Sequence, residues 1–290
     1  MTPSRAMLCA LAGFFLWVLC DTVVKLGGQA ALSPFMILAF LGVTAFASIG
    51  GSVVARQNIA LLRPRKWRFH ALICLCGIGV NFANVVALKY LPLTIFYIVV
   101  FSAPLVIAFF SALMKHEVLT KTKVLCLFAG FFGVVLAVAT RQWESGEGIG
   151  YIAAMASVLC FSAASILMRR IAQTETVESL QLFRAGAIGL FGIMGVLLIQ
   201  PGEMPGLQMT ALLVVAGIFN AMGNVLNNRA LQHTAASNVE QLHYTQLVWG
   251  AILGFLLWNE IPTGNLIAGS AIIIVSGILV AREVHKNGNA

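Results

Sequence analysis

Charged residues are scarce in this sequence. Aspartate, glutamate, lysine and arginine together make up 10% of the 290 residues, and Asp21 is the only aspartate. Soluble domains carry about 25% charged residues, whereas 60% of this chain is hydrophobic and its mean hydropathy is +0.93. Apolar runs of about 20 residues, the length that crosses a bilayer, recur from end to end. The composition therefore excludes a soluble fold and predicts an all-α integral membrane protein.

The motifs of common catalytic and ATP-binding sites are also missing. The sequence has no H-E-x-x-H, no G-x-S-x-G, no glycine-rich phosphate loop and no paired carboxylates within one segment. Its six cysteines lack the C-x2-C spacing that is typical of zinc sites. We therefore expect no enzyme activity, no bound metal and no cofactor. The net charge of +8 does not indicate nucleic acid, because the cations lie in short connectors between apolar runs.

Ten spans are predicted, separated by connectors in which glycine, proline and charged residues gather. They cover residues 7–27, 34–54, 69–90, 92–114, 124–140, 149–171, 179–200, 209–230, 236–258 and 263–281. The first run resembles a signal peptide, but no small-residue cleavage site closes it, so we expect it to be retained as a span.

The cations predict the orientation of these spans. Fourteen lysines and arginines fall on one side of the predicted membrane and three on the other, with Arg184 inside the seventh span. Because cytoplasmic connectors carry such an excess, we expect a multi-pass inner-membrane protein with both termini in the cytoplasm.

The two halves of the sequence are related by a constant shift, which we call the repeat shift. It places Asn81 on Asn224, Asn84 on Asn227 and Glu117 on Glu260. A shift that is longer by a single residue, which we call the neighbouring register, places Lys25 on Arg169. Each half holds five predicted spans, and an odd number inserts the second half upside down relative to the first. We therefore expect two inverted five-helix repeats, residues 1–141 and 148–284, with a solute site near the midplane between them.

Amide side chains are the main candidates for a solute pathway. Asn220, Asn224 and Asn227 share one face of a helix, and Asn81 and Asn84 occupy the matching places in the first half. An amide can bind a polar solute without bringing charge into the membrane. The alternative is that these side chains hold neighbouring helices together.

Two tyrosines are further candidates, again with a functional and a structural interpretation. Tyr97 and Tyr244 could stack on a flat solute or pack in the core, and the repeat shift places Tyr97 on Glu240.

The glycines of the seventh span recur every third residue and predict close packing against another helix. They are Gly186, Gly189, Gly192 and Gly195. Pro104 is expected to kink the fourth span.

Four ionisable side chains are predicted to lie within the membrane, where such groups are costly and often functional. Asp21 could contact the solute or a proton, or it could pair with Lys25 one helical turn further on. Glu240 and His243 could form an inner gate or a proton-linked site, although Glu240 could simply favour a helix start. We hypothesise that Arg184 pairs with Glu240, either as an inner latch or around a substrate carboxylate.

The chain resembles the EamA-like branch of the drug/metabolite transporter superfamily over nearly its whole length. The resemblance rests on the layout of five plus five spans, on Trp17 and Lys25, and on Pro92, Pro104 and Glu117. In the second half it rests on Arg170, Phe183-Arg184 and Trp258-Asn259-Glu260, whereas Leu41 stands where the first half of the family often has an arginine. It implies alternating access by rocking of the repeats, with a pathway along spans one, three, four, six, eight and nine.

These observations predict a secondary transporter of a small amphipathic metabolite. An amino acid or derivative, an S-adenosylmethionine-like solute and a vitamin such as riboflavin all suit the mixed lining, and the resemblance covers such substrates. A drug and metabolite exporter of broad specificity fits the same pattern. Titratable side chains within the spans favour proton coupling. The expected partners are the solute and the lipid bilayer, and the resemblance allows a monomer.

Overall fold

The computed structural model of the chain describes residues 3–103, 106–107, 110, 121–139, 146–171, 174–200, 204–233, 242–261 and 263–288. Within these ranges every regular element is a helix. The helices are α1 (Pro3–Gln29), α2 (Pro34–Ala55), the 3-10 turn η1 (Ile59–Leu62), α3 (Trp67–Tyr90), α4 (Leu93–Val100), α6 (Lys121–Ala139), α7 (Glu147–Ile171), α8 (Val177–Leu198), α9 (Leu207–His233), α11 (Thr245–Trp258) and α12 (Gly264–Gly288).

Six of these helices are long and apolar enough to cross a membrane by themselves, namely α1, α2, α3, α7, α8 and α9. Shorter apolar helices accompany them within α6, α11 and α12. Large apolar side chains such as Leu125, Phe128 and Ile152 are more than 70% exposed, which suits contact with lipid. The prediction of an all-α integral membrane protein is confirmed.

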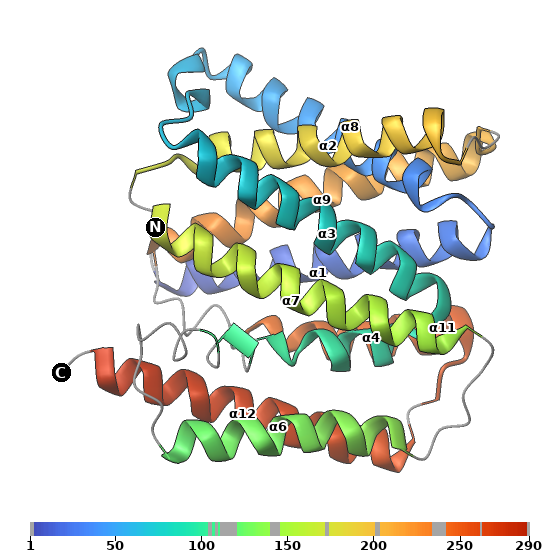
Figure 1. The fold of residues 1–290 in the computed structure, drawn as a ribbon, viewed down its shortest axis with the longest axis vertical. Helices are drawn as coiled ribbons and strands as arrows, with labels where there is room; N and C mark the ends of the chain where they lie inside the picture. The colour runs from blue at the N-terminus through green and yellow to red at the C-terminus, as the bar shows by residue number, and fades with distance from the viewer. Residues whose placement is uncertain are drawn as a thin grey trace.

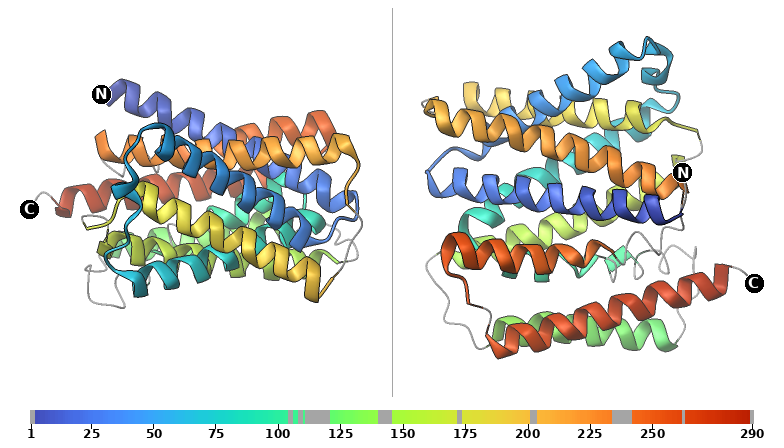
Figure 2. Two further views of the ribbon diagram at one scale, coloured as in Figure 1. Left: turned by 90° about the horizontal axis from the view of Figure 1, so that it is seen from above. Right: turned by 180° about the vertical axis from the view of Figure 1, so that it is seen from behind.

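The helices run side by side across the molecule (Figure 1). α1 begins and α12 ends at the same end of the bundle, which we call the terminal end (Figure 1). α1 ends and α12 begins at the opposite end, which we call the distal end. α6 and α12 form a pair at one edge, and both views of Figure 2 keep them together.

The contacts between helices follow the inverted repeat. α1 packs along α9 and α3 packs along α7, and these two pairs change places when the halves of the chain are exchanged. α2 packs against α8, α4 against α11 and α6 against α12, so each of these helices meets its own counterpart. The helices are therefore arranged as two inverted repeats around an approximate two-fold axis.

Two helices that the sequence predicts as continuous are broken near the centre of the bundle. The predicted span 92–114 begins as α4, but α4 ends at Val100, and Phe101 and Ser102 form a turn. The predicted span 236–258 is interrupted at Tyr244, directly before α11. The rings of Phe101 and Tyr244 lie 5.3 Å apart, so the two breaks meet.

The same hydroxyl contact accompanies both breaks. The Ser102 hydroxyl donates a hydrogen bond to the Val99 carbonyl at 2.7 Å, and the Thr245 hydroxyl donates one to the Leu242 carbonyl at 2.6 Å. Such bonds compete with the helical ladder for its acceptors. The repeat shift relates both hydroxyls and both acceptors. Pro104, which is predicted to kink the fourth span, lies outside the described residues.

The glycine stripe of α8 packs against α2, as predicted. A Cβ atom on Gly192 would lie 2.3 Å from the backbone nitrogen of Ala39, and one on Gly189 would lie 2.9 Å from that of Val43. No side chain fits at these distances, so glycine allows the two backbones to approach. This contact joins the two repeats at the second helix of each.

A buried carboxylate also joins the repeats, at the terminal end. Glu175, between α7 and α8, accepts hydrogen bonds from the amides of Arg65 and Lys66 at 3.0 and 2.7 Å, and His70 Nε2 lies 3.1 Å from its Oε2. Burial acts to raise the pKa of Glu175, but these hydrogen bonds outweigh burial and the pKa lies below its usual value. The carboxylate thereby stabilises the start of α3.

The α2–α8 contact predicts the effect of a side chain at Gly192. Gly192→Val should lower the apparent unfolding temperature of the purified protein, because overpacking a contact costs about 1–3 kcal/mol. Gly51→Ala on α2 is the matched control, since a Cβ atom there meets open space. The control should unfold at the same or a higher temperature, as alanine is about 1 kcal/mol better than glycine in a helix. Equal unfolding temperatures for both variants would contradict the packing role.

The lowered pKa of Glu175 predicts how stability depends on pH. A carboxylate with a lower pKa in the folded state stabilises that state above about pH 4.3, the ordinary glutamate pKa, and the stabilisation disappears as pH falls through the folded-state pKa. Glu175→Gln should therefore unfold more readily at neutral pH and lose less stability on acidification. Glu178→Gln is the control, because Glu178 makes only a partly exposed 3.9 Å pair with Arg56. An unchanged acid profile in Glu175→Gln would refute this role.

Candidate functional site

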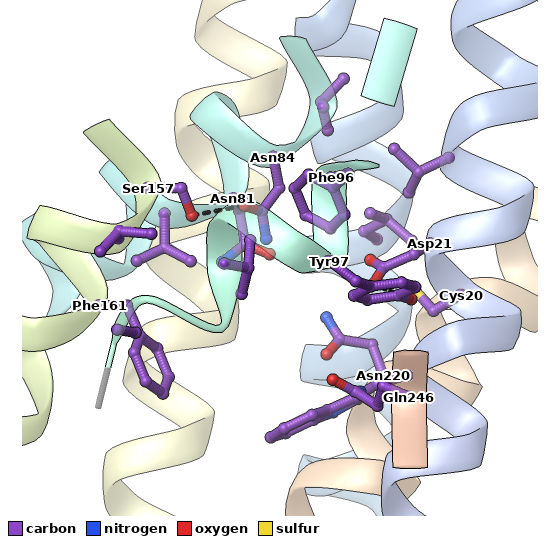
Figure 3. A pocket seen from close by; sticks show the side chains of 18 of the residues that line it. Cys20, Asp21, Asn81, Asn84, Phe96, Tyr97, Ser157, Phe161, Asn220 and Gln246 are labelled. Carbon is purple, nitrogen blue, oxygen red and sulfur yellow. Dashed lines mark hydrogen bonds between the residues drawn. The ribbon is translucent and has the colours of Figure 1, made fainter. Parts of the chain in front are cut away.

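A cavity of about 130 Å³ lies between the two repeats at the centre of the bundle. α1, α3 and α4 contribute to its wall from the first repeat, and α7, α9 and the start of α11 contribute from the second. These are the six spans that the family resemblance implies, and Leu41 of α2 and Arg184 of α8 complete the lining. In Figure 3, Asn81, Asn84 and Ser157 lie on one side of the cavity, and Asp21 and Cys20 lie on the other.

Most of the predicted site residues meet at this cavity. Its lining includes Asp21, Asn81, Asn84, Tyr97, Arg184, Asn220, Asn224 and His243. Asn227 and Tyr244 are buried elsewhere, and Glu240 lies outside the described residues. The hypothesis that Arg184 pairs with Glu240 therefore stays a prediction.

The two repeats present their asparagines in the same way. The side-chain amide of Asn81 donates to the carbonyl of Gly77 at 2.8 Å, and that of Asn224 donates to the carbonyl of Asn220 at 2.7 Å. Each bond reaches back one helical turn, and the repeat shift relates the two donors. The Asn224 amide also lies 2.9 Å from the side-chain oxygen of Asn220. These bonds hold the polar side chains in place on both sides of the two-fold axis.

Asn84 and Asn227 lie at contacts between helices of different repeats. The Ser157 hydroxyl of α7 donates a hydrogen bond to Asn84 Oδ1. Asn227 is 6% exposed and lies against Gly13 of α1, where a Cβ atom would come within 2.8 Å of Asn227 Oδ1. The position of Asn84 suits either a pathway residue or a helix contact. Asn227 occupies a helix contact away from the cavity.

Asp21 has a partner that local spacing does not predict. The Tyr97 hydroxyl donates a hydrogen bond of 2.8 Å to Asp21 Oδ2, whereas Lys25 pairs with Glu260. The alternative that Lys25 neutralises Asp21 is thus wrong in this structure, because a carboxylate 235 residues away takes its ammonium group. Tyr97 is 1% exposed, so Asp21 meets a buried neutral donor at the cavity wall.

An ion pair joins the two repeats at the distal end of the bundle. Lys25 is 5% exposed and pairs with Glu260, which also accepts the backbone N–H of Leu93 at 3.1 and 3.3 Å. The Lys25 ammonium lies 4.3 Å from the centroid of the Trp258 ring, whose N–H donates to Gln29 at 2.7 Å. We call Lys25, Glu260 and the Leu93 amide the distal ion pair. It connects α1, α4 and the end of α11.

Aromatic rings pack behind the cavity residue His243. His243 stacks on Phe14 with ring centroids 4.7 Å apart, and its ring meets that of Phe101 edge-on at 5.2 Å. Gln246 donates to the Phe14 carbonyl at 3.2 Å. His243 and Gln246 line the cavity, while Tyr244 packs on Phe101 within the core.

Sequence reasoning missed two features of this site. Ser157 lies in an apolar run and gives no polar pattern of its own, so its bond to Asn84 could not be expected. The pairing of Lys25 with Glu260 had a partial signal, because the repeat shift and its neighbouring register single out both residues. Among the described residues, no three His, Cys, Asp or Glu side chains gather where they could hold a metal ion.

Comparisons with known proteins show what the chain is similar to. The model of the EamA-like transporter family matches the chain twice, at residues 4–139 and 148–282. The pseudopaline exporter CntI of Pseudomonas aeruginosa (strain UCBPP-PA14) is 25% identical over 80% of this chain and 78% of its own length. The riboflavin transporter of Brucella anthropi is 20% identical over 86% of this chain and 89% of its own length.

The fold itself has a close structural counterpart. A solved crystal structure superposes on the chain with a TM-score of 0.70 at 22% identity, and it covers 99% of both chains. The two matches of the family model together span most of the sequence, and the curated relatives carry transporter names. The chain is a membrane transporter, not an enzyme, and it belongs to the EamA-like transporter family.

Proposed function

We propose that the chain is a secondary transporter that carries a small amphipathic metabolite across the inner membrane by alternating access. The observation that supports this proposal best is the central cavity. Both repeats line it with polar side chains, and the distal ion pair joins the repeats at one end of the bundle. A solute bound there would lie between two units that can rock against each other.

The distal ion pair gives this mechanism a gate. We take the rocking units to be residues 1–141 and 148–284, with both termini in the cytoplasm and the protein acting as a monomer. Lys25 belongs to the first unit and Glu260 to the second, so rocking that opens the distal end separates them. Separation in a dry environment would leave two uncompensated charges. The pair should therefore part only as water enters from the distal side.

The lining favours a solute with both polar and flat parts. Asn81, Asn220 and Asn224 offer amide donors and acceptors, and Trp17 and Phe96 offer aromatic surface. Relatives named as a pseudopaline exporter and a riboflavin transporter support a metabolite of this general kind. An amino acid derivative, an S-adenosylmethionine-like solute or a vitamin would fit. Asp21 is the proposed proton site, because it is a carboxylate at the cavity wall.

Counterflow in proteoliposomes tests the pathway. A pooled set of labelled metabolites, including amino acids, S-adenosylmethionine and riboflavin, would be offered to the wild type, Asn224→Ala and the exposed control Asn58→Ala. We expect one solute class to move, and we expect Asn224→Ala to slow it about tenfold, since a lost hydrogen bond costs about 1 kcal/mol or more. Asn58→Ala should match the wild type.

An imposed pH gradient in the same assay tests the coupling. A gradient should accelerate counterflow in the wild type, and Asp21→Asn should remove that acceleration. Movement of many unrelated solutes would instead favour the broad-specificity exporter. If the wild type moves no member of the pool, the proposal of an autonomous metabolite transporter fails.

A further inference from the structure

Arg184 occupies a distinctive place in the cavity wall. It comes from α8, which packs mainly against α2 and also contacts α3. It lines both the central cavity and a side cavity of about 20 Å³. Asn81, Asn220 and Asn224 also line both cavities. The guanidinium-bearing side chain therefore stands among amides where the two spaces meet. The side cavity is large enough for about one water molecule, or for one oxygen of a bound group.

No carboxylate balances this guanidinium in the part of the chain that the structure describes. The ion pairs there join Lys25 to Glu260, Arg56 to Glu178 and His70 to Glu175. Asp21 bonds to the Tyr97 hydroxyl instead.

Among the described residues, the thiols of Cys74 and Cys76 on α3 are titratable groups near Arg184, and Asp21 and His243 line the same cavity. The stem of Arg184 lies against Gly77, where a Cβ atom would be 2.9 Å from Arg184 Cγ. Among the residues that the structure describes, the surroundings thus supply packing for the side chain but no counter-charge.

A cation in a membrane-spanning helix is costly when no anion faces it, and such a residue marks a functional site. Arg184 is partly buried, and it forms no ion pair with the described residues. Arginine presents five N–H donors in a planar fork that matches two carboxylate oxygens. We propose that the transported solute carries a carboxylate and that Arg184 binds it. This inference rests on the proposed transport function and specifies the substrate class of the same cavity.

The number of charges favours a carboxylate over a phosphate. Among the described residues, Arg184 is the only arginine or lysine in the lining of either cavity. One guanidinium neutralises one negative charge, so a dianion would keep an unbalanced charge beside Asp21. Asn220 and Asn224 lie in the same linings and add neutral donors.

Benzoate and benzamide form a matched pair of probes for this site. They have nearly the same shape, and only benzoate carries a carboxylate. Apolar protein cavities of about 150 Å³ hold benzene, so both probes suit the size of the site. The purified full-length chain would be titrated with each probe while its unfolding temperature is followed. We expect benzoate to raise the unfolding temperature at about a tenfold lower concentration than benzamide, because charge-assisted hydrogen bonds are the stronger ones.

Two variants locate the effect. Arg184→Gln should make the two probes equivalent, and Arg63→Gln, an exposed change between η1 and α3, should leave the difference intact. Without probe, Arg184→Gln should unfold at the same temperature as the wild type or higher, because it removes an unbalanced charge. Equal action of both probes on the wild type would overturn the proposal. So would a destabilised Arg184→Gln that Glu240→Gln restores, since Arg184 would then belong to an internal ion pair.

Transport measurements distinguish a failure of the carboxylate site from a failure of the proposed transport function on which it rests. Counterflow of a solute without any anionic group, unaffected by Arg184→Gln, would overturn the carboxylate site and leave the transporter proposal standing. If benzoate binding depends on Arg184 but the protein moves no solute, the result would support the carboxylate site and contradict the proposed transport function.

Discussion

The ion pair between Lys25 and Glu260 determines how the two repeats meet at the distal end. Lys25 is almost fully buried, and removing either partner would leave a charge without compensation in a poorly hydrated place. The Leu93 amide binds the same carboxylate, so the start of α4 is fixed by the same contact. Because the pair spans the repeats, any motion that opens this end must replace the pair with water. Opening and hydration are thereby coupled.

The inverted repeat places two helix breaks next to the cavity. α2 and α8 are held together through glycines with backbone contacts that leave no room for a side chain. The fourth and ninth spans instead break at Phe101 and Tyr244, beside each other and beside the cavity-lining His243. A broken helix can change direction at its break without losing a full ladder of hydrogen bonds. The rigid contact and the two breaks together suit repeats that rock around a central solute.

The sequence predicts the architecture better than the individual contacts. Composition and the repeat shift predict the inverted halves, and the same shift brings Asn81 and Asn224 to equivalent positions at one cavity. Helical spacing does not predict the partner of Lys25, because it favours the nearby carboxylate of Asp21, whereas the structure pairs Lys25 with Glu260. The repeat aligns the hydroxyls of Ser102 and Thr245 beside the two breaks, but this alignment does not predict a break, because serine and threonine are common in unbroken helices. Burial of Asn227 depends on the close approach of Gly13, which no pattern in the sequence encodes.

Distance measurements between spin labels test the gating role of the distal ion pair most directly. Labels would be placed at Ala30→Cys and Ile261→Cys, two exposed positions at the distal ends of the first and second repeats, after replacement of the six native cysteines. The account predicts two distance populations, with Glu260→Gln shifting the protein toward the longer distance. A single distance that Glu260→Gln leaves unchanged would contradict the claim that this pair holds the distal end closed.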